Sequence, residues 1–235
     1  MWDEERCGQL RGRLEALADP KYREFHSRIV PGIGQLYGVR MPQLKLLAKE
    51  ILREDPEGFL SVCRGTSYEE DMLRGLVLGG LRDADVYERQ LRAFLPALSN
   101  WAVCDGTAAA SKVVGRNRER FYPVIEELLR AEEVYSVRFG YVLLLDYYLT
   151  EEYLTRVLRH CRQSRGEYYI DMAIAWLISV AYVKFPGQTE ELLKDNELND
   201  FTQNKAIQKI RESYRVSRED KTRLLRYRRP PAEKA

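Results

Sequence analysis

The sequence is poor in residues that bind metals or form covalent cross-links. Its 235 residues include only two histidines and four cysteines, with no CxxC pair, at His26, His160, Cys7, Cys63, Cys104 and Cys161. A structural zinc site needs closely spaced pairs of ligands, so we expect no metal site. Because unpaired cysteine is among the residue types most often buried, we expect reduced and mostly buried thiols.

Long apolar runs and common catalytic motifs are also missing. No run approaches the roughly 20 apolar residues that a membrane-spanning helix needs, and the first five residues, MWDEE, do not resemble a signal peptide. We therefore expect a cytoplasmic protein without membrane contact. There is no glycine-rich phosphate loop, GxSxG elbow or HExxH helix. This argues against nucleotide hydrolysis, serine-hydrolase and zinc-protease chemistry.

Charge is balanced overall but not along the chain. The net charge is only +2, with 45% hydrophobic and 31% charged residues, a mixture typical of globular proteins. Residues 201–235, however, contain eleven Lys or Arg against four Asp or Glu. We expect one domain over residues 1–220 and a basic tail over 221–235. Such a tail contacts phosphates or is simply a frayed, solvated terminus, and we favour the frayed terminus.

Apolar residues recur at helical spacing almost throughout. Leu44, Leu47, Ala48 and Ile51 follow the i, i+3, i+4, i+7 pattern after Pro42, which suits a first helical turn. Similar stripes occur in 91–98, 137–148 and 170–181, and turn residues interrupt the chain at short intervals, including Gly115 and Pro123. No alternating run bounded by hairpin turns competes. The pattern predicts an all-α protein, a solenoid of antiparallel helix pairs.

The most unusual local feature is the segment Ser99–Asp105. Asn100 is a good N-cap for the helix that follows, and Trp101 and Asp105, four residues apart, leave one face of that helix. An aromatic surface beside a carboxylate suits a cationic ligand. The alternative is structural, because a helical tryptophan is more often part of the core and an aspartate is often an ion-pair partner.

Two further residues are candidates on weaker grounds. Arg138 lies at the edge of an apolar stripe, where a half-buried guanidinium pairs with a carboxylate such as Asp105 or binds a phosphate. Trp176 lies at the flank of the nearly all-apolar segment 168–185, and core packing is the simpler explanation for it.

Taken in order, these segments resemble the DNA alkylation repair family of AlkD-like, HEAT-repeat DNA glycosylases. The resemblance runs from about Asp19 to Tyr214. The matching segments are GVRMP at 38–42 with Leu44, Leu47 and Ala48, then Asn100, Trp101 and Asp105, then Arg138, then MAIAW at 172–176 and KFP at 184–186. Each is short, but they share an order and a spacing with the family.

The resemblance implies a HEAT-like helical solenoid that excises N3- and N7-alkylated purines from double-stranded DNA. It implies a catalytic role for Asp105, and contacts with the DNA or the lesion for Trp101, Arg138 and Trp176. Such chemistry needs no metal or cofactor, because an alkylated purine already carries positive charge and leaves without protonation. We expect a monomer, cytoplasmic and associated with the nucleoid.

The chain also departs from the family. Family members tend to carry a polar pair such as Gln-Lys where this chain has Asp171 and Met172, and another basic residue beside the arginine, where it has Val137. Both changes remove positive charge near the expected DNA groove. A non-catalytic protein that binds branched or distorted DNA, and a protein-interaction scaffold, are therefore the alternatives to an alkylpurine DNA glycosylase.

Overall fold

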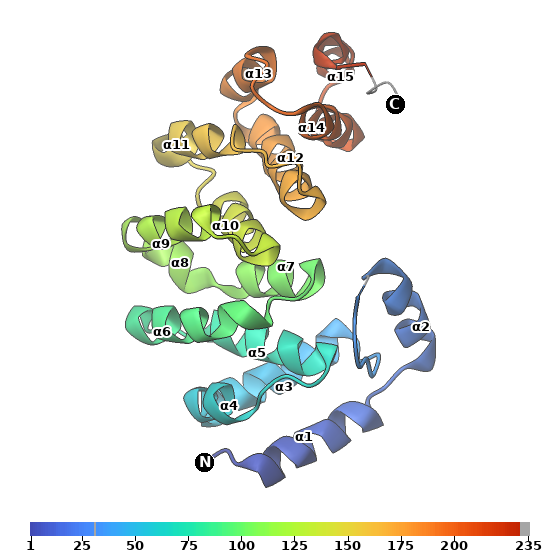
Figure 1. The fold of residues 1–235 in the computed structure, drawn as a ribbon, viewed down its shortest axis with the longest axis vertical. Coiled ribbons are helices and arrows are strands. Elements are labelled where there is room, and N and C mark those ends of the chain that lie inside the picture. The colour runs from blue at the N-terminus through green and yellow to red at the C-terminus, as the bar shows by residue number, and fades with distance from the viewer. Residues whose placement is uncertain (31, 231–235) are drawn as a thin grey trace. The chain divides into compact units, whose positions relative to one another are not determined.

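The structure is a computed structural model and describes residues 1–30 and 32–230. Over these residues the protein is all-α, with two short 3-10 turns and no β-strand, which confirms the predicted fold class. The chain divides into two compact units, Met1–Phe121 and Tyr122–Ala235. Each unit is built of packed helix pairs, as in a helical-repeat protein (Figure 1). The division falls within α9.

The first unit is a series of helices in which α3 packs on α5 and α5 packs on α7. The shorter helices α4 and α6 also pack on α5. The elements are α1 (Glu4–Ala16), α2 (Pro20–Ile29), α3 (Met41–Glu54), α4 (Pro56–Val62), α5 (Tyr68–Gly80), α6 (Ala84–Phe94), η1 (Leu95–Ala97), α7 (Trp101–Ala110), α8 (Lys112–Arg116) and the start of α9 (Arg118–Arg130).

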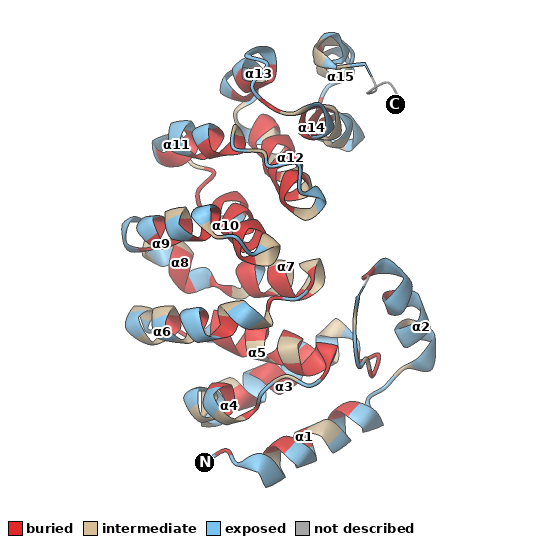
Figure 2. Ribbon diagram, viewed as in Figure 1, coloured by how far each residue is buried: buried red, intermediate tan, exposed pale blue. Residues whose placement is uncertain are grey.

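The second unit repeats this scheme, with α10 packed on α12 and α12 packed on α14. Figure 2 shows α12 buried over most of its length, as predicted for a helix that is apolar almost all round. The elements are α10 (Val134–Tyr147), α11 (Glu151–Cys161), α12 (Tyr168–Lys184), α13 (Pro186–Lys194), α14 (Asp200–Glu212), α15 (Arg218–Arg223) and η2 (Leu224–Tyr227).

The predicted apolar stripes form the core. Leu44, Leu47, Ala48 and Ile51 are all buried on α3, and Pro42 lies in its first turn. One predicted break is wrong, because Pro123 lies inside α9, whereas the break near Gly115 is confirmed, because α8 ends at Arg116. A proline removes one backbone donor from a helix, and the buried neighbours Phe121, Tyr122 and Ile125 anchor α9 around it.

A buried carboxylate holds the long segment between α2 and α3. Glu69 on α5 is fully buried and accepts hydrogen bonds from the backbone N–H groups of Tyr37 (3.0 Å), Gly38 (2.7 Å) and Val39 (3.1 Å). Gly38 has φ +90°, and a Cβ there would lie 2.6 Å from Cβ of Arg23. The segment GVRMP therefore needs glycine at its first position, and Glu69 fixes the backbone that leads into α3.

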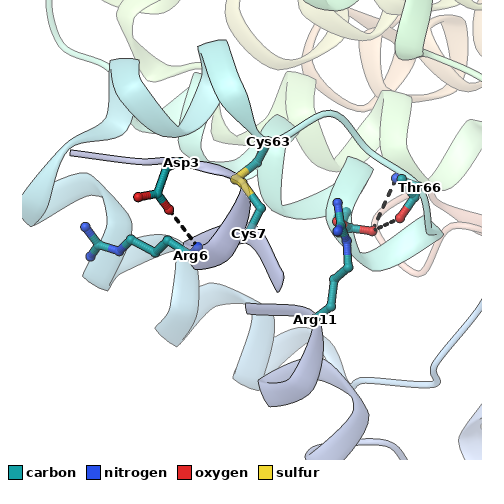
Figure 3. The surroundings of a disulfide bond; sticks show 7 residues. Asp3, Arg6, Cys7, Arg11, Cys63 and Thr66 are labelled. Carbon is teal, nitrogen blue, oxygen red and sulfur yellow. Dashed lines mark hydrogen bonds and ion pairs between the residues drawn. A yellow bond between two sulfur atoms is a disulfide. The ribbon is translucent and has the colours of Figure 1, made fainter. Parts of the chain in front are cut away.

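The cysteines differ from the sequence-based expectation. Cys7 on α1 and Cys63, the residue after α4, form a disulfide with Cα atoms 5.7 Å apart (Figure 3). Cys104 and Cys161 are buried free thiols. The expectation of four reduced thiols is therefore wrong for the first pair. Spacing in the sequence does not show that α1 lies against the end of α4.

Disulfides are rare in the reducing cytosol. The stability of the protein is therefore expected to depend on whether this bond is oxidised or reduced. Reduction, or the double substitution Cys7→Ser and Cys63→Ser, is expected to lower the free energy of unfolding by about 2–4 kcal/mol, because the bond closes a loop spanning 56 residues. Urea titration with and without dithiothreitol measures the effect. The double variant, which has no bond to lose, is the control. An unchanged midpoint on reducing the wild-type protein would contradict the prediction.

The basic tail is folded rather than frayed as far as the structure describes it. Leu224 is fully buried, and Arg223 pairs with Glu190 of α13 at 2.9 Å. Gln203 and Asn204 of α14 donate side-chain hydrogen bonds to the carbonyl groups of Tyr227 and Arg229 respectively. The expected frayed tail is therefore wrong for residues 221–230, because acidic and amide groups of α13 and α14 hold it. Residues 231–235 of the expected tail lie outside the described residues.

Candidate functional site

Trp101 and Asp105 lie one helical turn apart on α7, in the first unit. Asn100 caps this helix as predicted, and its side chain accepts hydrogen bonds from the N–H groups of Ala102 and Val103, both at 3.0 Å. Trp101 and Asp105 are both half-buried. The indole Nε1 of Trp101 donates to the carbonyl oxygen of Ile29 at 3.3 Å. The end of α2 therefore fixes the plane of the indole ring.

The same face of α7 continues toward a cleft. Ala109 follows Asp105 by one further turn, so Trp101, Asp105 and Ala109 form a stripe at i, i+4, i+8. Ala109 and Gly106 both line a cleft of about 570 Å³ in the first unit. The carboxylate of Asp105 therefore belongs to a helix face that leads directly into this cleft.

The cleft is basic and has no acidic residue in its lining. Its remaining walls come from α3, from the end of α5 and from α8, and they carry five cations: Lys45, Lys49, Arg82, Lys112 and Arg116. All five side chains are exposed, and none forms an ion pair within the described chain. By contrast, Arg13 and Arg89 of the same unit pair with Glu50 and Glu57. Five unneutralised cations around one hollow favour a polyanionic ligand.

This cleft was not predicted from the sequence. Its cations are spread over residues 45–116 and come from separate elements, so no single short window of the sequence contains them. The excess of positive charge in the sequence lies instead at the C-terminus, where part of it is neutralised by Glu190 and Asp200. One signal was available, because Lys45 and Lys49 are one turn apart and flank the buried stripe of α3.

Arg138 and Trp176 lie in the second unit, on the packed helices α10 and α12. Arg138 is more buried than expected, with 7% of its surface exposed, and its Nη1 donates to the carbonyl oxygen of Tyr169 at 2.8 Å. Trp176 is half-buried, at the flank of its helix as predicted. The structure thus brings Trp101 and Asp105 together on one helix, and Arg138 and Trp176 on two neighbouring helices of the other unit.

Asp171 has a structural role that was not predicted from the sequence. It is buried at 1% exposure and accepts hydrogen bonds from N–H of Arg165 (3.2 Å), N–H of Gly166 (3.1 Å) and Nδ2 of Asn199 (2.7 Å). The oxygens of its carboxylate therefore find their hydrogen-bond donors inside the second unit.

Among residues 1–30 and 32–230, no three His, Cys, Asp or Glu side chains are placed to hold a metal ion. The helices of this same described part are all too short or too polar to cross a lipid bilayer.

The chain is therefore an all-α helical-repeat protein with a basic cleft whose lining contains no acidic residue. A sequence model of the family described as DNA alkylation repair enzyme matches residues 10–210. The chain belongs to this family, as its short motifs indicated, and membership places it in the repair of alkylated DNA. No curated protein matches the chain.

Proposed function

We propose that the protein is a DNA glycosylase that hydrolyses the N-glycosidic bond of N3- and N7-alkylated purines in double-stranded DNA. The observation that carries this proposal is the stripe Trp101–Asp105–Ala109, which leads from an indole and a carboxylate into a cleft lined by five unpaired cations. The cations of the cleft would bind a polyanion such as DNA, and the indole and carboxylate of the stripe would bind a cationic group of that DNA. Family membership supplies alkylated DNA as the substrate class.

The chemistry follows from the charge of the lesion. Alkylation at N3 or N7 makes the purine cationic, so it departs with the bonding electrons and without a general acid. The deoxyribose then develops oxocarbenium character. In our proposal the carboxylate of Asp105 stabilises this positive charge and orients the attacking water, which gives its hydroxyl to C1′ and loses a proton. No metal or cofactor takes part in any of these steps.

The other three residues are proposed to hold the nucleotide. The indole of Trp101, fixed by its hydrogen bond to Ile29, presents an aromatic face to the lesion, and Trp176 does the same from α12. Arg138 contacts a backbone phosphate and keeps the nucleotide in register. The hydrogen bond to Tyr169 and the small exposed fraction of Arg138 favour a single preoriented contact.

Release of free base from alkylated DNA tests the proposal. Duplex DNA treated with a methylating agent is incubated with excess protein, and free 7-methylguanine and 3-methyladenine are separated and quantified against a protein-free blank. We expect release of at least one of the two above the blank. Absence of both at high protein concentration would overturn the proposal. Salt-sensitive DNA binding without release would instead favour a non-catalytic DNA-binding protein.

A further inference from the structure

A second, smaller cleft lies in the second unit at the ends of two inner helices. It has a volume of about 320 Å³ and is lined by Ser179, Val180, Val183, Lys184, Ser213, Tyr214 and Arg215. These residues come from the last turns of α12 and from the segment that follows α14. The volume is at the lower end of the range for small-ligand sites, about 300–1,000 Å³.

An exposed aromatic ring, that of Tyr214, lies at the edge of this cleft. Tyr214 is fully exposed, and its ring packs against no other described side chain. Its backbone is held in place, because the neighbouring Val216 is buried and N–H of Arg215 donates to Oγ of Ser213 at 3.2 Å. A fixed backbone with an open aromatic face is suited to stacking on a planar ligand.

The lining is positively charged as well as apolar. Lys184 is exposed and has one long hydrogen bond, 3.5 Å, to the carbonyl oxygen of Leu149, and Arg215 is exposed without an ion pair among the described residues. No acidic side chain lines the cleft. Cations beside an aromatic ring suit the phosphates and the base of an unpaired nucleotide.

The cleft also lies beside a residue of the proposed site. Val180 follows Trp176 by four residues and Val183 by seven, so all three share one face of α12. Val180 is about 6 Å farther along the helix axis than Trp176. A nucleotide next to one that contacts Trp176 therefore reaches this cleft.

We propose that the cleft binds an unpaired nucleobase, displaced from the duplex next to the damaged nucleotide. Tyr214 stacks on the base, Val180 and Val183 cover its edge, and Lys184 and Arg215 contact the flanking phosphates. This inference rests on the proposed function, since it takes DNA as the ligand and Trp176 as a contact of the damaged nucleotide.

The test uses DNA that the enzyme cannot cleave. The probe is a duplex in which 2-aminopurine, whose fluorescence falls when it stacks on a ring, lies next to a tetrahydrofuran abasic analogue in the same strand. The displaced base is expected to be quenched in the complex with wild-type protein, relative to the complex with Tyr214→Ala, where it has no ring to stack on. Tyr214→Ala is expected to abolish the quenching and weaken binding of the probe by about 5- to 150-fold, whereas Tyr214→Phe keeps both. Lys184→Gln and Arg215→Gln are each expected to lower the salt dependence of binding by about one unit of slope.

Controls separate this result from general loss of DNA binding. Tyr214→Ala is expected to leave the affinity for an intact duplex unchanged, and Tyr168→Ala, at another exposed tyrosine of the second unit, is expected to change neither affinity. Equal quenching and affinity in wild type and Tyr214→Ala would overturn the inference. Base release without stacking at Tyr214 overturns this inference alone. Stacking without base release overturns the proposed hydrolysis alone.

Discussion

Asp105→Asn is expected to reduce the rate of release of 7-methylguanine by about 100- to 1,000-fold. This range is typical when one preorganised electrostatic group is removed from a transition state. The amide keeps the shape of the side chain but loses the charge that opposes the developing oxocarbenium ion. The rate is measured in single turnover with enzyme in excess, so that product release does not mask the chemical step.

The control for this prediction removes the same charge elsewhere. Glu119 is exposed on α9 within the first unit, and Glu119→Gln is expected to leave the rate unchanged. Circular dichroism and urea titration verify that Asp105→Asn remains folded. Since alkylated purines also depart spontaneously, every rate is compared with a protein-free blank. Release by Asp105→Asn at the wild-type rate would remove Asp105 from the mechanism.

The double substitution Lys45→Gln and Lys49→Gln is expected to weaken binding of undamaged duplex DNA by about 100-fold. Each charge-assisted contact contributes about 1.5 kcal/mol or more, and about 1.4 kcal/mol corresponds to a factor of ten. The slope of log K against log salt concentration is expected to fall by about 1.8, because each neutralised phosphate contributes about 0.9. Fluorescence anisotropy at several salt concentrations measures both quantities.

A matched pair tests whether the location of the charge matters. Arg13 and Arg89 are exposed in the same unit but pair with Glu50 and Glu57. The double variant Arg13→Gln and Arg89→Gln removes the same formal charge, and we expect its affinity and salt slope to stay close to wild type. Equal losses in the two double variants would show that only overall charge matters, and would argue against the cleft as the DNA site.

Local structure could largely be predicted from the sequence, because it depends on neighbours along the chain. The apolar stripe of Leu44 to Ile51 and the N-cap at Asn100 were both correct, since each needs only a spacing of three or four residues. Pro123 was misjudged because packing of its neighbours outweighs the lost backbone donor. The tail was misjudged because its partners, such as Glu190, lie in another helix.

In the candidate site, too, features within one helix could be predicted from the sequence and features that depend on contacts between helices could not. The shared face of Trp101 and Asp105 was predictable, because both belong to one helix. The disulfide between Cys7 and Cys63 was not, since it depends on contact between α1 and the end of α4. The five cations of the basic cleft were not recognised as a group either, because they come from separate elements. Burial of Arg138 and Asp171 likewise depends on packing between helices.

Glycines bring α5 close to α7 and so determine where the helix of Asp105 lies. A Cβ added at Gly75 would lie 2.0 Å from Oγ1 of Thr107, and one added at Gly79 would lie 2.4 Å from Cβ of Ala110. Replacing a helical glycine by alanine is a common way to engineer thermostability. At Gly79 the added methyl group would instead displace the backbone of α7 at Ala110, and at Gly75 it would displace the buried side chain of Thr107, in the helix that carries Asp105. An engineered, more heat-resistant form of this protein must therefore gain its stability at other positions.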